Sequence, residues 1–349
     1  MAIDTTTAAP GPQTNTEPRQ PTALTQAAKR FTRRPEFAAL IGLLVSFCFF
    51  AYTTRGSDFV SLDGSAAWLN VAAELGIAAA CVSLLLIAGE FDLSIGSMVG
   101  TASMVVAIGS GYYTWPLWVS IVAALLVAAV IGFINGYVVV RTGLPSFIVT
   151  LAMQFVLAGA SLGLARLISN TTSISVPVSG SAKTVFAAKW GQYSVTIMWW
   201  IGLTIIAEVV LITTRFGNWV YATGGNPNSA RAEGVPVKKV KIILFMTTSI
   251  GAALVGILQT LQFNSGDVTR GRGIIFTSII AVVIGGALLS GGYGSAVGAM
   301  IGAMTYGIVS VGIFFTGWNS DWVSLFLGVL LFLAVLANNY FRKLALARR

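Results

Sequence analysis

Two carboxylates stand inside long apolar stretches of the sequence. Glu74 interrupts the stretch 67–88, nearer its outer end, and Glu208 lies in the stretch 195–213. Acidic side chains at membrane depth are energetically costly and usually mark a solute pathway, a proton relay or a buried pair. Asn70 lies one helical turn before Glu74, on the same helix face. We therefore predict that Asn70 and Glu74 line a solute path, with a hydrogen bond between helices as the alternative. Glu208 is expected to reach the nearby inner membrane surface.

A second group of polar residues occupies the short segment 89–97, which reads Gly-Glu-Phe-Asp-Leu-Ser-Ile-Gly-Ser and separates two apolar stretches. Side-chain oxygens of Asp and Ser commonly accept hydrogen bonds from the free N–H groups that open a helix, where the helix dipole also favours negative charge. We therefore expect Asp92 and Ser94 to cap the helix that follows, with Gly96 and Ser97 in its first turn.

A third polar segment is basic and rich in Gly and Asn, and it follows the apolar stretch that holds Glu208. Its Asn-Pro-Asn-Ser sequence, which begins at Asn226, is typical of a helix start, whereas Gly234 and the proline two residues later are typical of a helix end. A short helix is therefore predicted near residues 229–234.

None of these groups forms a recognisable catalytic centre. The chain contains no His, which removes the commonest general base and the commonest transition-metal ligand. It also lacks the phosphate-binding Gly-x-x-x-x-Gly-Lys sequence and any cluster of metal-ligating residues. Cys48 and Cys81 lie in apolar stretches and are expected to behave as small hydrophobic residues. We expect a non-catalytic protein without a cofactor, for which another chain would have to supply energy from ATP.

The composition requires a membrane around these groups. Of the 349 residues, 56% are hydrophobic and 9% are charged, and the mean hydropathy is +0.82. Soluble domains carry about 25% charged residues, so most of this surface must face lipid. A backbone in hydrocarbon must form helices or a closed barrel. Continuously apolar runs such as 121–134 lack the alternation of barrel strands. We predict an all-α polytopic membrane protein.

Charged residues and turns divide the sequence into about ten apolar segments, each near the roughly 20 residues that a helix needs to cross a membrane. Two blocks of 48 uncharged residues must each hold two helices, with breaks at the turn-rich stretches 109–116 and 290–295. The single spans are predicted at 37–54, 67–88, 146–167, 195–213, 242–261 and 322–340, and the paired spans at 93–140 and 273–320. The polar stretch 169–192 is predicted to be the longest loop.

The basic residues are distributed unequally between the two sides of this arrangement. If the N-terminus is inside, the inner segments hold 15 of the 21 Lys and Arg residues. Cytoplasmic loops are enriched in these residues, so we predict both termini in the cytoplasm. Residues 1–35 are predicted to be a disordered cytoplasmic tail, 36–341 the transmembrane domain and 342–349 a basic cytoplasmic tail. The net charge of +9 then needs no nucleic-acid partner.

Small residues near the end of the chain are spaced for close helix packing. Gly294, Gly298 and Gly302 recur every four residues and are predicted to share one helix face, with Ala299 and Ala303 beside them. Such a flat stripe lets helix backbones approach one another in lipid.

Three segments resemble motifs of the permease subunits of sugar-type ATP-binding cassette importers, the membrane components of bacterial ribose, xylose, galactose and related uptake systems. They are Gly-x-x-Asp-Leu-Ser-x-Gly-Ser at 89–97, the loop with Gly-Gly-Asn at 222–235, and the Ala-Val-Val-Ile-Gly-Gly block at 281–295. The similarity extends from about residue 69 to residue 336, in the same order. The first motif departs from the family pattern at Glu90 and Phe91, where Gly and Ile are more usual.

The resemblance implies a bundle of about ten helices in the bacterial cytoplasmic membrane that moves a sugar or polyol by alternating access. It implies three kinds of partner: an ATP-binding cassette ATPase subunit, an extracytoplasmic solute-binding protein, and a second permease copy or paralogue. In such importers a short cytoplasmic helix of the permease docks in a cleft of the ATPase, and residues 222–236 occupy its place. The residues implied in this coupling are Asn226, Ser229, Ala230, Arg231, Glu233 and Gly234.

The residues alone also allow two other functions. A proton-coupled secondary transporter would pass protons between Glu74 and Glu208, provided that burial shifts the pKa values of these carboxyl groups. A membrane scaffold without transport would explain neither these acids nor the segment 89–97. The three family segments and the lack of paired charges near mid-membrane favour the importer.

Overall fold

The computed structural model describes residues 36–346, with side chains described as far as residue 337. Of the two predicted tails, residues 1–35 and 347–349 lie outside the described residues, and the last helix continues to Leu346. Apart from four short strands, the regular elements of the described residues are helices. The predicted all-α class is confirmed.

Eight helical segments are long and apolar enough to cross a membrane. Seven of them are the uninterrupted helices α2 (Glu36–Thr53), α3 (Leu62–Ile87), α5 (Leu117–Thr142), α6 (Ser146–Ser169), α8 (Thr196–Thr213), α11 (Val237–Gln262) and α13 (Ala296–Thr316). The eighth begins as α4 (Ile95–Val106) and ends in the π-helical turn η2 (Ala107–Tyr112).

Two further apolar helices complete the set that the sequence predicted. They are α12 (Ile274–Ile284) and α14 (Trp322–Leu346). Of the about ten predicted spans, α12 is shorter than expected, because its 11 residues are about half the number needed to cross. Gly286 follows with φ +95°, a left-handed conformation that suits glycine. The chain then runs through turns until α13 begins.

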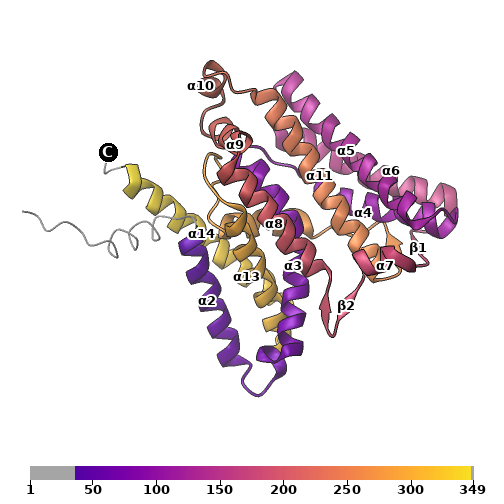
Figure 1. Ribbon diagram of the computed structural model, residues 1–349. Helices are drawn as coiled ribbons and strands as arrows, with labels where there is room; N and C mark the ends of the chain where they lie inside the picture. The colour runs from indigo at the N-terminus through magenta and orange to yellow at the C-terminus, as the bar shows by residue number, and fades with distance from the viewer. Residues whose placement is uncertain (1–35, 347–349) are drawn as a thin grey trace, which may run out of the picture. The chain divides into compact units, whose positions relative to one another are not determined.

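The short elements gather at the two ends of the spans. At one end lie α7 (Gly180–Phe186), the hairpin of β2 (Lys189–Trp190) and β3 (Tyr193–Ser194), and β1 (Ser173–Ser175), which pairs antiparallel with β4 (Ser265–Asp267). The predicted long loop therefore holds a short helix and two strands, and β3 follows directly after it. The 3₁₀ turn η1 (Asp58–Val60) joins α2 to α3. At the other end lie α9 (Arg215–Gly225) and α10 (Pro227–Ala232), as Figure 1 shows. We call the end with β2 and β3 the hairpin end and the opposite end the α10 end.

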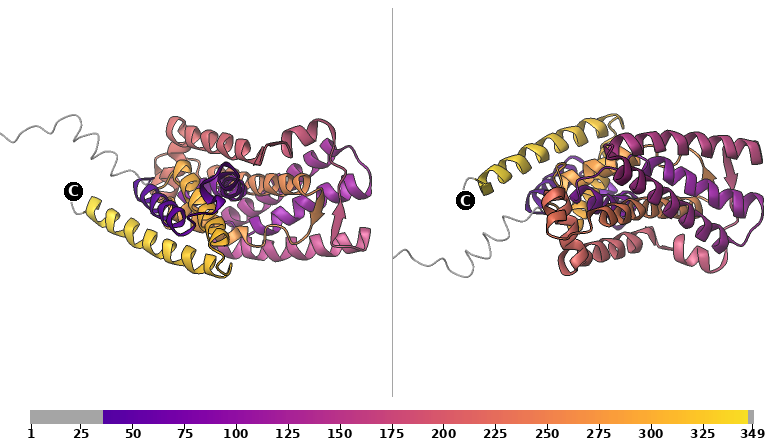
Figure 2. Two further views of the ribbon diagram at one scale, coloured as in Figure 1. Left: turned by 90° about the horizontal axis from the view of Figure 1, so that it is seen from below. Right: turned by 90° about the horizontal axis from the view of Figure 1, so that it is seen from above.

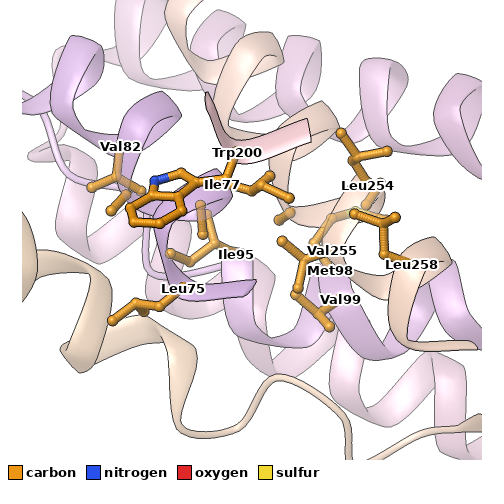
Figure 3. Packing of buried hydrophobic residues seen from close by; sticks show 14 of the residues in the cluster. Leu75, Ile77, Val82, Ile95, Met98, Val99, Trp200, Leu254, Val255 and Leu258 are labelled. Atoms are coloured by element: carbon orange, nitrogen blue, oxygen red, sulfur yellow. The ribbon is translucent and has the colours of Figure 1, made fainter. Parts of the chain in front are cut away.

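The core is built around α3, most of which is buried, whereas few residues of α2 and α6 are buried. Small residues along α3 allow neighbouring helices to approach closely. Gly76 lies against the indole of Trp200 of α8, since a Cβ atom there would collide with it. Figure 3 shows Trp200 close to Ile77 and Val82 of α3. The end-on views in Figure 2 place α2, α6, α8 and α14 around the central helices. Their outward faces expose large apolar side chains, as lipid requires.

The glycine stripe of α13 packs against α12. A Cβ atom on Gly298 or Gly302 would collide with the carbonyl oxygen of Gly285 or Ala281, so close packing is confirmed for these two glycines. The prediction that Gly294 lies on the same helix face as these two glycines is wrong. Gly294 has φ +149° and precedes the helix, because α13 opens with Ser295 as its N-cap.

Candidate functional site

The break between α3 and α4 is held by a buried network around Asp92. One carboxylate oxygen, Oδ1, accepts hydrogen bonds from the N–H of Ser94 at 2.9 Å and from its hydroxyl at 2.6 Å. The other, Oδ2, accepts from the hydroxyl of Thr248 in α11 at 2.8 Å. Asn135 of α5 donates to the Ser94 hydroxyl oxygen at 2.9 Å. Burial raises the pKa of Asp92, and the bonds from Ser94 and Thr248 oppose that rise.

The same break is tied to α6 through its backbone. The N–H of Phe91 donates to the Ser146 hydroxyl and the N–H of Leu93 donates to the Thr150 hydroxyl, each at 3.0 Å. Together with the bonds to α5 and α11, these contacts fix the segment against three helices. They satisfy backbone donors that would be costly to bury unpaired.

The predicted capping role of Asp92 and Ser94 is wrong. Ser94 occupies the N-cap position of α4 but makes no capping hydrogen bond, because its hydroxyl is engaged by Asp92 and Asn135. Asp92 binds the N–H of Ser94 itself and no N–H of the first turn. The two residues join helices to one another instead.

Gly96 and Ser97 lie in the first turn of α4, as expected. A Cβ atom on Gly96 would lie 2.5 Å from the Ile275 side chain and 2.9 Å from the Gly271 carbonyl oxygen, so glycine lets the start of α12 and the segment before it pack on α4. Ser97 accepts a hydrogen bond from the Thr101 hydroxyl through its backbone carbonyl, at 2.8 Å. Neither residue is joined to the Asp92 network by a hydrogen bond.

The predicted short helix at the α10 end is confirmed, although it begins and ends two residues earlier than expected. The Asn226 side chain accepts from the N–H groups of Asn228 and Ser229 at 3.0 and 3.1 Å, and a proline occupies the first helical position. Gly234 has φ +85° and turns the chain away after the helix. Ala230 is buried.

This helix presents polar and charged groups outward. Five of the residues predicted to couple to the ATPase are exposed, either in the helix or directly beside it. They are Asn226, Ser229, Arg231, Glu233 and Gly234. A six-residue helix with one buried alanine has little core of its own. Such a helix depends on neighbouring structure for a fixed position.

Four glycines bring the three family segments together at one junction, which includes the end of α9. A Cβ atom on Gly224 would lie 2.6 Å from the Gly292 nitrogen, and one on Gly291 would lie 2.8 Å from the Gly89 Cα. The N–H of Gly292 donates to the carbonyl of Ile87, at the end of α3, at 2.7 Å. We call Gly89, Gly224, Gly291 and Gly292 the glycine junction. The sequence contained paired glycines in two of the three segments, but their mutual contact is a tertiary feature that spacing does not reveal.

Glu208 is fixed by a partner that the sequence did not indicate. Its Oε2 accepts from the N–H groups of Ala296 and Val297, the first residues of α13, at 2.8 and 3.2 Å. Tyr221 of α9 donates to the Gly294 carbonyl at 2.8 Å, just before the same helix. The expected reach of Glu208 to the membrane surface is therefore replaced by a contact between helices.

Asn70 and Glu74 face different partners. The side chain of Asn70 donates to the Gln192 carbonyl at 2.8 Å and accepts from the Ser194 N–H at 2.9 Å, so it secures the β2–β3 hairpin. Glu74 accepts from the side chain of Gln259 in α11 at 2.8 Å and is partly buried. The interhelical hydrogen bond, which is the alternative prediction for Glu74, is thus present.

Comparisons with known proteins agree with the three segments. The family model described as branched-chain amino acid transport system / permease component matches residues 64–335. The fructose import permease protein FrcC of Rhizobium meliloti is 33% identical over 322 residues, which are 89% of this chain and 87% of that protein. The ribose import permease protein RbsC of Escherichia coli (strain K12) is 30% identical over 312 residues, 87% of this chain and 94% of that protein.

The xylose transport system permease protein XylH of Haemophilus influenzae is 27% identical over 360 aligned positions, which cover 86% of this chain and 94% of that protein. No solved structure matches the chain. The family match spans all three segments and nearly all the helices described above, and the similarity to FrcC extends over most of both proteins. The chain is therefore a multi-pass protein of the inner membrane that belongs to this family of ABC transporter permease components.

Proposed function

We propose that the chain is the membrane subunit of an ATP-driven importer and carries a monosaccharide or polyol into the cytoplasm. The description of the family refers to branched-chain amino acids, whereas the three relatives above are named for fructose, ribose and xylose. Those relatives align over most of their length, which supports a sugar-like solute. An ATP-binding cassette ATPase, an extracytoplasmic solute-binding protein and a second permease, identical or paralogous, would complete the importer.

The observation that carries this proposal is the exposed helix α10 above the glycine junction. Arg231 and Glu233 offer opposite charges to a docking partner, and Ala230 anchors the helix on the permease. The glycine junction joins the base of this segment to α3 and to the turns before α13 through backbone contacts. Movement of α10 by an ATPase would therefore be passed directly to helix ends, where small shifts become discrete rearrangements of packed helices.

The proposed solute path includes Glu74. A carboxylate at this depth can accept hydrogen bonds from sugar hydroxyls while Gln259 holds it in place. Asn70 contributes by positioning the hairpin at the entrance, since both polar atoms of its side chain are engaged there.

The test is uptake by the assembled importer in vesicles. Radiolabelled fructose, ribose and xylose would be offered with the binding protein and ATP, with leucine as the comparison solute. We expect sugar uptake that requires ATP and continues when the proton gradient is collapsed. Uptake that stops with the gradient would support the proton-coupled alternative, and uptake of leucine alone would contradict the sugar assignment.

The proposed orientation places α10 and both termini in the cytoplasm. In a background in which Cys48 and Cys81 are replaced, single cysteines at Ser181 and Ser229 should react with impermeant reagents from opposite sides, Ser181 from outside. Both native residues are isolated free thiols, so their replacement breaks no disulfide. Labelling of both positions from one side would contradict the proposed topology.

A further inference from the structure

A cavity of about 600 Å³ opens at the α10 end, between the α5–α6 connection and the start of α11. Four cationic side chains line it, together with one carboxylate. They are Arg141, Arg231, Lys238, Lys241 and Glu90. The volume is within the range of ligand-binding pockets. The lining therefore has three positive charges in excess of its negative charge.

The single carboxylate in this lining is already paired. Glu90 forms an ion pair with Lys241, and the two side chains are only 11% and 17% exposed, respectively. Among the side chains described, those of residues 36–337, Arg141, Arg231 and Lys238 have no ion pair or side-chain hydrogen bond. Three exposed cations thus line the cavity with hydrogen-bond donors that no described residue uses.

The position of these charges is not explained by helix stability. Lys238 and Lys241 lie in the first turns of α11, where the helix dipole disfavours positive charge. This unfavourable placement suggests a compensating anion, and among the described residues that line the cavity only Glu90 carries a negative charge.

The cavity also lies at a membrane boundary. Its wall includes the residues 143–145, which connect two spans and must therefore be near the edge of the hydrocarbon layer. Leu144 on this wall is exposed, as are Tyr137, Phe147 and Ile148 on the adjoining surfaces of α5 and α6. A charged group in the cavity would thus lie directly beside a surface that faces acyl chains.

We propose that this cavity binds a phosphate group, in the form carried by an anionic phospholipid. Arg presents paired N–H donors that fit phosphate oxygens, and Lys adds compact positive charge. Basic pockets between transmembrane helices on the cytoplasmic side commonly hold anionic headgroups. The apolar surface beside Leu144 would receive the acyl chains. A headgroup here would also contact Arg231 of α10, which makes the lipid a partner of the segment proposed for coupling.

The test compares Arg141→Gln and Lys238→Gln, singly and combined, with Lys239→Gln as the matched control. Lys239 is an exposed neighbour on the same helix that does not line the cavity. The full-length permease would be placed in nanodiscs of phosphatidylcholine alone or mixed equally with phosphatidylglycerol. Retained phosphatidylglycerol would be counted by native mass spectrometry, and a second arm would add inorganic phosphate to the permease in neutral detergent.

Each cation removed from the cavity should weaken phosphatidylglycerol retention roughly fivefold, the equivalent of about 1 kcal/mol per charge, whereas Lys239→Gln should have little effect. Lys238→Arg should restore retention, since it keeps the charge. If inorganic phosphate instead stabilises the permease in detergent against unfolding, and Arg141→Gln and Lys238→Gln abolish that stabilisation, the result would also support a phosphate site and would identify the free ion as its ligand. Equal losses in the control and cavity variants would overturn the proposal, because they would indicate non-specific surface charge. Unchanged lipid and phosphate binding with weakened ATPase co-purification would also overturn it and assign the cavity to the ATPase interface.

Discussion

The carboxylate of Glu208 accepts a hydrogen bond from the backbone N–H of Ala296 at 2.8 Å, although the two residues are 88 positions apart. The same oxygen binds the next N–H, that of Val297, and the Ser295 hydroxyl accepts from the N–H of Gly298 at 2.9 Å. The free donors at the start of α13 are thus satisfied partly by α8. A carboxylate at a helix N-terminus is also favoured by the helix dipole.

This relationship predicts the behaviour of Glu208 variants. Glu208→Ala should lower the free energy of unfolding by roughly 1–3 kcal/mol, because it leaves donors of α13 unpaired. Glu208→Gln retains an acceptor oxygen and should preserve ATP-driven uptake. Thermal unfolding of the purified permease and uptake in vesicles measure the two effects. Asp321→Ala, which removes an exposed carboxylate, is the control. Loss of uptake in a normally stable Glu208→Gln protein would favour a proton relay.

The glycine junction gives a second prediction, with a matched pair of adjacent residues. Gly224→Ala would force a Cβ atom against the Ile87 carbonyl and the Gly292 nitrogen, whereas Gly225→Ala meets nothing within 4 Å. The first change should destabilise the protein by about 1–3 kcal/mol or prevent its accumulation, and the second should be tolerated. Expression and thermal unfolding of both variants check this. Equal stability of the two variants would show that the junction is not tightly packed.

The position of α9 leads to a pH-dependent prediction. Burial, and then the negative charge of Glu208, raises the pKa of Tyr221 to about 12. An unfolded tyrosine has a pKa of about 10, so between these values the unfolded chain loses a proton that the native protein keeps. The stabilising contribution of Tyr221 should therefore be complete below pH about 10 and decline as the pH rises towards 12.

This prediction is checked by comparing the free energy of unfolding of the wild type with that of Tyr221→Phe between pH about 10 and 12. The wild type should lose its advantage as the pH rises, because its hydroxyl donates to the Gly294 carbonyl only while protonated. Tyr112→Phe, which removes an exposed hydroxyl without a described hydrogen bond, is the control. A pH-independent difference for Tyr221→Phe would contradict the assigned environment.

Much of the fold followed from the sequence because charge is so costly in lipid. Uncharged stretches located every apolar helix, and turn residues located the breaks between paired helices. The short length of α12 was not predicted, since hydropathy records how apolar a stretch is and not whether its backbone stays helical. Asn70, Glu208 and the glycines of the junction acquire their roles from residues far away in the chain. A pattern of local spacing contains no information about such partners.

Glu74 supports a fourth prediction, in which transport and stability are separated. Glu74→Gln preserves the shape of the side chain and an oxygen that can accept from Gln259, so the permease should fold and assemble normally. If the carboxylate contacts solute, uptake should fall about tenfold or more, as expected for loss of one charged hydrogen bond. Gln259→Glu would place two acids together and should reduce stability instead. Normal uptake by well-expressed Glu74→Gln would leave Glu74 only a packing role.

The last prediction concerns α10 and its proposed contact with an ATPase. Ala232 is the last residue of this helix, where a proline would remove a helical N–H donor and disfavour the helical conformation of the residue before it. Ala232→Pro should therefore disrupt α10 while the spans insert normally, because the segment lies outside them. Glu233→Lys should disturb docking by reversing an exposed charge. Both variants should reach the membrane in normal amounts but show weaker ATPase co-purification and little ATP-driven uptake. Lys189→Ala, at the hairpin end, should leave ATPase association intact. If Ala232→Pro retained full association and uptake, α10 could not be the coupling element, because a rigid docking helix is required to transmit the movement of the ATPase to the glycine junction.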